Sequence, residues 1–320
     1  MQELPRLFKS YREIEMRENF DASHGITVEN FKSLIGQYHF DKVVCCQVRK
    51  SEGNCGNKHL RGWLGKTKHG KECLIGGHCA IKYFNASKNF STERNRVRKE
   101  INISKYIDFL NILLKDAKKY EAELDLELGR LRSIKDLKGT LEGKMVNGVP
   151  KLLSDMAKTV NSSINIEVQY IEVDEDNNKH IDWVVKSIGN VRGVQIWLYS
   201  NLGSVFSELK SIREAFSNVE ISRNSGERKL KRWFDTLSGL ENVRSKIDDI
   251  YREFKEFTDP SNLSLLIFMV RNHKDQVKMA KLALEYSGHP SPSDREAKKL
   301  IKKHEDSIRK SNSNRNFRVA

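Results

Sequence analysis

The sequence has little apolar material and no long apolar run. Of its 320 residues, 38% are hydrophobic and 31% are charged, a balance that favours solvent-exposed helices over a thick sheet core. The longest apolar run is Leu265–Val270, far shorter than the ~20 residues that a membrane-spanning helix needs. Residues 1–19 are charged throughout and lack the apolar segment of a secretory signal peptide. We therefore expect a cytoplasmic protein with no membrane partner.

Cysteine is absent outside one short window. All five cysteines lie between Cys45 and Cys79, where they are interleaved with His59, His69 and His78. In a reducing compartment, clustered cysteines indicate a metal site rather than disulfide bonds. Structural zinc takes four sulfur or nitrogen ligands in a tetrahedral arrangement. The window therefore predicts structural Zn²⁺. The alternative without function is that the five thiols lie close together by chance and bind no metal.

The spacing within the window suggests which residues bind the metal. Cys55 and His59 lie in a Gly/Asn-rich turn, and Cys79 follows two glycines at the expected start of a helix. A helix N-terminus favours an anionic thiolate. We predict Cys46, Cys55, His59 and Cys79 as the ligands. In the alternative set, Cys73 replaces His59 and all four ligands are thiolates.

The order of strand, knuckle, hairpin and ligand-bearing helix in residues 41–84 resembles treble-clef and zinc-ribbon modules. The pattern C-x8-C-x3-H followed by IGGHCA is similar to small zinc-binding segments in uncharacterised proteins of bacteria and mobile elements. The spacing departs from the usual paired C-x2-C pattern, so the resemblance leaves the ligand set open and implies no activity.

Positive charge is concentrated around the cysteines. Residues 42–100 hold 14 Lys and Arg against 4 Asp and Glu, so they carry +10 of the total formal charge of +14. Such a surface favours binding to polyanions, and to nucleic acid above all. Alternatively, the lysines and arginines only keep exposed helix faces soluble. Trp63 would stack on a base or belong to a local core. The predicted nucleic-acid contacts are Lys58, Arg61, Trp63, Lys66, Lys68, Lys71, Arg94, Arg96 and Arg98.

A seven-residue apolar repeat follows the basic segment. One set of positions holds Ile103, Leu110, Ala117, Leu124 and Leu131, and the matching set holds Tyr106, Leu113, Tyr120 and Ile134. About four heptads of this kind predict a coiled-coil hairpin or a dimer arm, with residues 103–134 as the surface for a protein partner or a second copy. A helix in an ordinary bundle produces the same stripe.

These patterns predict a mainly α protein. It would combine a small α+β zinc-bound module, a long coiled-coil-like helix and a helical C-terminal domain with a minor β element. The expected segments are 1–40, helical; 41–90, the zinc-binding module; 91–150, the helical arm; 151–310, the C-terminal mostly helical domain; and 311–320, a disordered basic tail.

Finer expectations concern four segments. Thr27 would cap a helix that contains Phe31 and Leu34. Residues 164–173 would form a strand, and the spacing of apolar residues over 181–188 is helical. A helix over about 227–257 would end before Asp259-Pro260, because the residue before a proline disfavours the α conformation.

The function that these features favour is non-catalytic. We expect a zinc-containing accessory protein of a bacterium, phage or mobile element that binds DNA or RNA. One alternative is a protein-interaction subunit in which zinc is only structural. A weaker alternative is a metal-dependent nuclease whose acidic residues come from distant segments.

Overall fold

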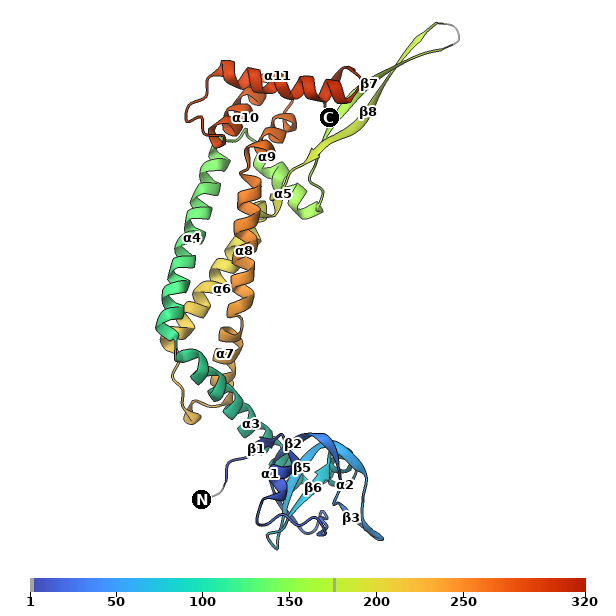
Figure 1. Ribbon diagram of the computed structural model, residues 1–320, viewed down its shortest axis with the longest axis vertical. Coiled ribbons are helices and arrows are strands. Elements are labelled where there is room, and N and C mark those ends of the chain that lie inside the picture. Colours follow the sequence, from blue (N-terminus) through green and yellow to red (C-terminus); the bar gives the residue numbers. More distant parts are fainter. Residues whose placement is uncertain (1–2, 175–176) are drawn as a thin grey trace. The chain divides into compact units, whose positions relative to one another are not determined.

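A computed structural model describes residues 3–174 and 177–320 (Figure 1). The protein is mainly α, with 56% of residues in helices and 21% in strands. The chain divides into two compact units: residues 1–117 with 218–237 form the N-terminal unit, and residues 118–217 with 238–320 form the C-terminal unit. This division differs from the five segments expected from the sequence. No described helix is long and apolar enough to cross a bilayer.

A mixed sheet of order β1-β2-β5-β6 organises the N-terminal unit. Strand β5 pairs antiparallel with both β2 and β6, and β1 pairs parallel with β2. The sheet strands are β1 (Arg6–Phe8), β2 (Phe31–Cys45), β5 (Lys58–Thr67) and β6 (Glu72–Gly76). The remaining elements of this unit are α1 (Tyr11–Glu15), β3 (Arg49–Lys50), β4 (Gly53–Asn54), α2 (Gly77–Phe84), α3 (Lys88–Leu114), the 3₁₀ turn Arg223–Ser225 and α7 (Glu227–Ser238).

The helix expected after Thr27 is wrong, because Phe31 begins the long strand β2. Buried residues alternate along its middle, at Gly36, Tyr38 and Phe40, with the two-residue period of a strand. The register with β5 shifts near Phe31 and again near Leu34. These shifts separate two buried positions by three residues, and that spacing looks helical in the sequence.

Each face of this sheet has its own apolar core. On one face, Phe31, Trp63 and Ile75 pack against Phe84 of α2 and Phe90 of α3. On the other face, Tyr38, Phe40, Leu64 and Leu74 pack with Ile14 of α1. Neighbouring residues of β5 therefore point to opposite cores, as the two-residue period of a strand requires.

The heptad stripe is divided between two helices, so the single long arm is wrong. Helix α3 ends at Leu114 and α4 (Ala117–Lys144) begins after a two-residue break. In α3, Tyr106 and Phe109 contact Phe234 of α7, with ring centroids 5.0 and 4.7 Å apart. The stripe residues Ile103, Leu110, Leu124, Leu131 and Ile134 are buried within the chain, as the bundle alternative predicts.

Three helices, α4, α6 (Tyr199–Asn218) and α8 (Leu240–Phe257), pack together in the C-terminal unit. Tyr120 of α4 stacks on Phe216 of α6 at 5.4 Å, and Lys246 of α8 bonds Glu208 of α6 at 2.7 Å. The other elements are α5 (Val149–Thr159), β7 (Ser163–Val173), β8 (Lys179–Asn190), the 3₁₀ turns Val194–Trp197 and Leu266–Met269, α9 (Pro260–Leu265), α10 (His273–Tyr286), α11 (Asp294–Ser311) and β9 (Phe317–Val319).

Strands β7 and β8 form a long antiparallel hairpin (Figure 1). The strand expected at 164–173 is confirmed, but the helix expected over 181–188 is wrong, since these residues lie in β8. Residues 317–319 form β9, which pairs with residues 166–168 of β7. The expected disorder of the tail is therefore wrong for these three residues.

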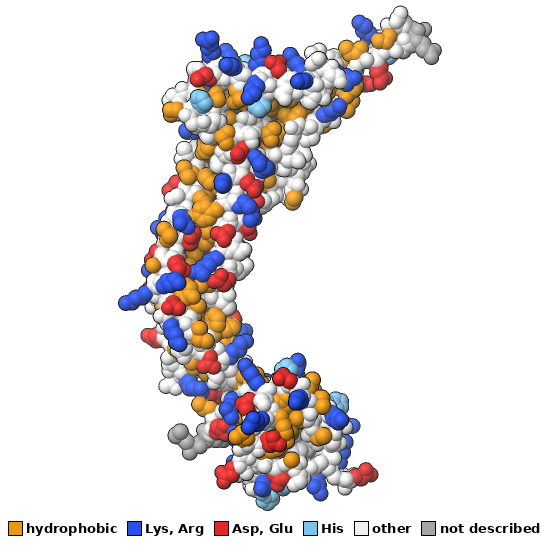
Figure 2. Space-filling model, in the orientation of Figure 1, with side chains coloured by type: hydrophobic (Ala, Val, Ile, Leu, Met, Phe, Trp, Pro, Cys, Tyr) orange, Lys and Arg blue, Asp and Glu red, His pale blue; other side chains and the backbone are white. Residues whose placement is uncertain are grey.

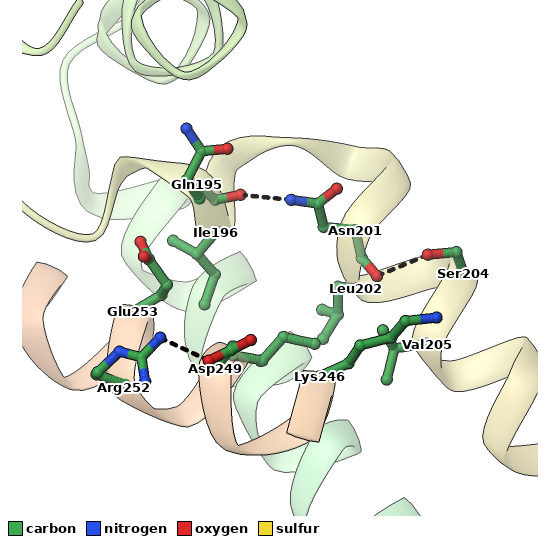
Figure 3. Close-up of a pocket in the computed structure, with 11 residues that line it drawn as sticks. Gln195, Ile196, Asn201, Leu202, Ser204, Val205, Lys246, Asp249, Arg252 and Glu253 are labelled. Carbon is green, nitrogen blue, oxygen red and sulfur yellow. Dashed lines mark hydrogen bonds and ion pairs between the residues drawn. The ribbon is translucent and has the colours of Figure 1, made fainter. Parts of the chain in front are cut away.

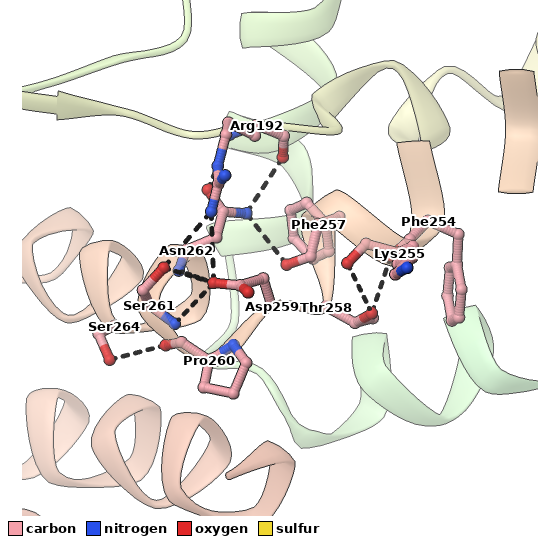
Figure 4. Close-up of polar contacts among 10 residues, drawn as sticks. All are labelled: Arg192, Phe254, Lys255, Phe257, Thr258, Asp259, Pro260, Ser261, Asn262 and Ser264. Carbon is pink, nitrogen blue, oxygen red and sulfur yellow. Dashed lines mark hydrogen bonds and ion pairs between the residues drawn. The ribbon is translucent and has the colours of Figure 1, made fainter. Parts of the chain in front are cut away.

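The helix expected over 227–257 is interrupted at Gly239, between α7 and α8. Its end before Asp259-Pro260 is confirmed, and Asp259 caps α9. Beside this cap, the buried Asn262 side chain accepts the Arg192 N–H at 2.8 Å and donates to the Phe257 and Arg192 carbonyls at 3.0 and 3.1 Å (Figure 4). One amide side chain thus joins the end of the hairpin to the turn between α8 and α9.

Candidate metal centre

Three of the predicted ligands converge in the N-terminal unit. The sulfur atoms of Cys46, Cys55 and Cys79 all lie within 4.8 Å of one another. Cys46 follows the last residue of β2, Cys55 follows β4, and Cys79 lies in the first turn of α2. Three thiols from separate elements are therefore in position to share one soft metal ion.

The backbone around Cys55 forms the expected knuckle. The Cys55 N–H donates to the Val48 carbonyl at 2.8 Å, and Gly56 has φ of +66°. This left-handed conformation suits glycine. It lets the Asn57 backbone N–H bond the Cys55 sulfur. The loop thus aims an N–H dipole at the thiol, which favours the ionised form.

The thiols of Cys55 and Cys79 differ in acidity. Burial tends to raise the pKa of Cys55, but hydrogen bonds from Asn57, Cys79 and Lys50 outweigh it and lower the pKa. Burial and the neighbouring Cys46 and Cys55 raise the pKa of Cys79 to about 12. The Cys55 and Cys79 sulfurs are 3.5 Å apart. Without a cation, Cys55 therefore ionises before Cys79. A bound cation would favour the thiolate form of all three.

His59 lies beside this group rather than within the 4.8 Å set. Its Nδ1 is 3.2 Å from the Tyr38 hydroxyl, while its Nε2 is buried and has no hydrogen-bond partner among the described residues. The ring packs closely on Gly76. A Cβ atom at position 76 would lie only 2.9 Å from Nε2, so a larger residue would not fit there. The Gly76 N–H in turn donates to the Cys46 sulfur at 3.4 Å. Burial lowers the pKa of His59, which favours the neutral ring that a metal ligand needs.

The structure places the other cysteines outside the group. Cys73 on β6 donates to the His24 carbonyl at 3.6 Å, and burial together with Asp21 and Glu72 raises its pKa to about 12. Cys45 is exposed at the end of β2. The all-thiolate alternative with Cys73 therefore lacks geometric support.

Sequence analysis missed two neighbours of the centre. The Lys50 ammonium donates to the Cys55 sulfur, and this bond raises the pKa of Lys50. Tyr38, from the opposite core, orients His59. Lys50 was one of many lysines in a basic window, and only the pairing of β3 with β4 brings it back to Cys55. Tyr38 lay within the segment that was expected to be helical.

Two predicted nucleic-acid contacts serve the fold instead. Trp63 is only 4% exposed and belongs to the core beneath α2 and α3. The prediction that its ring stacks on a base is therefore wrong. The Arg98 guanidinium lies 5.3 Å from the centre of its ring. Arg96 pairs with Glu93 at 2.7 Å and donates to the Leu34 carbonyl at 2.8 Å. Its charge is therefore already matched.

The remaining basic candidates lie at several places on the unit. Lys58 and Arg61 are exposed on β5, and Lys68 and Lys71 are exposed in the turn before β6. The ten residues of β5 separate Lys58 from that turn by roughly 30 Å. Half-buried Lys66 lies next to the turn, and Arg94 and exposed Arg98 lie on α3. The visible face of this unit in Figure 2 carries basic side chains at several separate points.

A scan against protein-family models matches no family, and searches of curated proteins and of solved structures find no match to the chain. The geometry and charge of the site are therefore the basis of the function proposed below.

Proposed function

We propose that the N-terminal unit is a zinc-stabilised module that binds nucleic acid without catalysis. The observation that carries the metal assignment is the convergence of Cys46, Cys55 and Cys79 within 4.8 Å, in a chain with only five cysteines. His59 is the proposed fourth ligand through Nε2, the buried ring nitrogen that has no described partner.

The donor set favours zinc over harder ions. Thiolates and a neutral imidazole select Zn²⁺ among the ions that bind proteins tightly, whereas Ca²⁺ and Mg²⁺ take oxygen ligands. Four protein ligands would leave no open position for water, which is the pattern of a structural site. Three thiolates, one imidazole and Zn²⁺ carry a net charge of about −1, and the Lys50 ammonium at Cys55 would offset it.

The positive charge of residues 42–100 supports nucleic acid as the partner. Exposed lysines and arginines contact phosphates at little cost in desolvation and do not read bases. Trp63 was the one aromatic residue among the predicted nucleic-acid contacts, and it is buried. None of those predicted contacts can therefore stack on a base. We therefore propose binding to the phosphate backbone with weak sequence preference.

Metal analysis of protein purified without a polyhistidine tag tests the zinc centre. We expect one zinc per chain, and Co²⁺ substitution should give the absorption of three thiolate ligands. His59→Ala should weaken metal binding at least about tenfold, whereas His69→Ala, which changes an exposed turn residue, should not. Protein without tightly bound zinc would overturn the assignment. An unaffected His59→Ala protein would remove only the fourth ligand.

Charge reversal tests the nucleic-acid proposal. Lys66, Lys68 and Lys71 changed together to Glu should weaken binding roughly tenfold or more, and each lost phosphate contact should flatten the log–log salt slope by about one. The matched control changes Lys298, Lys302 and Lys303 on α11 to Glu. Equal losses in both variants would reduce the effect to net charge. A wild-type protein that binds neither DNA nor RNA at low salt would contradict the proposal.

One observation favours a protein-interaction subunit as the second candidate. Ile171, Val173, Ile181 and Val185 of the β7–β8 hairpin are each more than half exposed. The pairing of Ile171 with Ile181 and of Glu167 with Val185 puts these four on one face. Orange side chains are visible along this hairpin in Figure 2. Exposed apolar faces of this kind are typical of protein contacts. Salt-insensitive capture of a protein in place of nucleic acid would favour this candidate.

A further inference from the structure

The C-terminal unit contains a groove that none of the sites above uses. It lies between α4 and the first turns of α6, and its cavity volume is about 430 Å³. This volume falls within the range of pockets that hold small ligands. Leu202 and Phe206 from α6, both partly exposed, supply its apolar surface, and the buried Leu131 of α4 lies beneath them. The groove is thus lined by two helices of one compact unit.

Two glycines keep the groove open. Gly139 on α4 and Gly203 on α6 both line it, and a Cβ added to either would meet no atom within 4 Å. Glycine inside a helix costs roughly 0.5–1 kcal/mol relative to alanine. Neither position is one where a neighbouring atom demands glycine. Both helices therefore leave out a side chain on the walls of the same groove.

The rim of the groove carries unmatched positive charge. Arg132, Lys135 and Lys138 line it together with one acid, Glu142. Arg132 lies 5.8 Å from the Phe206 ring centre. None of the three cations forms an ion pair with another described residue. The start of α6 adds the positive end of a helix dipole to the same place.

The hollow between α6 and α8 shows the contrast (Figure 3). There Arg252 pairs with Asp249 at 2.5 Å, and Lys246 pairs with Glu208 at 2.7 Å. Its cations are already neutralised by the protein. In the groove between α4 and α6, by contrast, the cations have no ion-pair partner among the described residues.

Lys138 is the most telling of the three cations. It is half-buried, and its ammonium lies 5.2 Å from the centre of the buried Trp197 ring. Burial lowers the pKa of Lys138, and the charge of Glu142 only partly opposes this. Such an ammonium has lost part of its hydration and has no ion-pair partner. A nearby anion therefore stabilises its charge more than it would stabilise a free surface lysine.

We propose that this groove binds an amphipathic anion, a ligand with an apolar chain and a carboxylate or phosphate head. The chain would lie on Leu202 and Phe206, in the space left by Gly139 and Gly203. The head would contact Arg132, Lys135 and Lys138. This site is independent of the metal centre and of nucleic-acid binding.

Calorimetric titration of the full chain with decanoate and with decyl phosphate, below their micelle concentrations, tests the proposal. The two probes distinguish the head groups, and at least one should bind saturably. Decanol, with the chain but no charge, and inorganic phosphate, with the charge but no chain, should each bind at least about tenfold more weakly. Equal binding of decanol would overturn the anion assignment.

Two matched pairs of variants locate the binding. Gly203→Leu should fill the groove and weaken binding more than about tenfold without lowering stability. Gly129→Leu, at an exposed glycine of α4 outside the groove, should leave binding unchanged. Arg132→Gln with Lys135→Gln should also weaken binding, unlike Lys118→Gln with Lys119→Gln, which removes two exposed charges of α4 outside the groove. Failure of both probes, equal effects within a pair, or binding of an acidic helical peptide in their place would overturn the proposal.

Discussion

The sheet of the N-terminal unit and the helices of the C-terminal unit are held together in different ways. On the α2 and α3 side of the sheet, Phe31, Phe84 and Phe90 form a ring cluster with centroids 4.9–5.9 Å apart. In the α4, α6 and α8 bundle, most buried side chains are aliphatic, such as Leu124 and Leu209, and Tyr120 and Phe216 form a stacked aromatic pair.

The difference is sharpest between residues 46 and 57. Between Cys46 and Cys55, this loop gives the aromatic core only Val48 in addition to the two cysteines, and its strands β3 and β4 have two residues each. Ordering a residue costs roughly 1–2 kcal/mol, which so little buried surface does not offset. The proposed metal ion would supply the stabilisation that the loop lacks.

The largest expected effect is loss of the metal centre. Cys79→Ser should lower zinc affinity by more than about 100-fold, since even outer-shell changes cost 10–100-fold. The loop should then lose protection from hydrogen exchange at Cys55 and Gly56, while α4 and α8 keep theirs. Cys45→Ser, at an exposed thiol, is the control. Normal zinc content in Cys79→Ser protein would break the comparison.

A charge in an aliphatic stripe should have the next largest effect. Leu124 is 1% exposed and Leu126, two residues along the same helix, is 56% exposed. Leu124→Asp should cost about 3–5 kcal/mol in the free energy of unfolding, because an unpaired charge replaces buried apolar surface. Leu126→Asp should cost little. Denaturant melts decide, and equal midpoints for the two variants would show that α4 packs on another face.

A smaller effect is expected at the polar clamp of the C-terminal unit, the hydrogen bonds that join Asn262 to Arg192 and Phe257. Asn262→Ala leaves the N–H of Arg192 and the carbonyl of Phe257 without their partner. It should cost about 1–3 kcal/mol in stability. The exposed Asn201, whose amide makes one long bond of 3.5 Å to the Gln195 carbonyl, provides the control as Asn201→Ala. Similar melting temperatures for both variants would mean that the clamp is dispensable.

The candidate metal centre could be predicted from the sequence because residues that bind metals are few in this chain and their chemistry is specific. Cys46, Cys55 and Cys79 were predicted together as ligands, and the structure brings their sulfurs within 4.8 Å of one another, where they could hold a metal ion. His59 was chosen from spacing alone, and its ligand role remains a prediction. Tyr38 and Lys50 were out of reach, since their contacts depend on strand pairing between residues distant in the sequence.

Secondary structure was misread where side-chain periodicity failed. In β2, register shifts moved the buried positions out of strict alternation. In β8, most side chains are exposed on both faces of the hairpin, so no face leaves a two-residue apolar period. The heptad stripe was real, but periodicity carries no information about a break such as the one between α3 and α4.

The pairing of β9 with β7 has a consequence for biosynthesis. Arg318 bonds Glu167 at 2.5 Å across a sequence separation of 151 residues. A ribosome that adds about 5–20 residues per second needs roughly eight to thirty seconds to make the intervening chain. During that interval the edge of β7 is open to other strands in the cell. Chaperones that shield extended segments would therefore have their longest opportunity at residues 166–168.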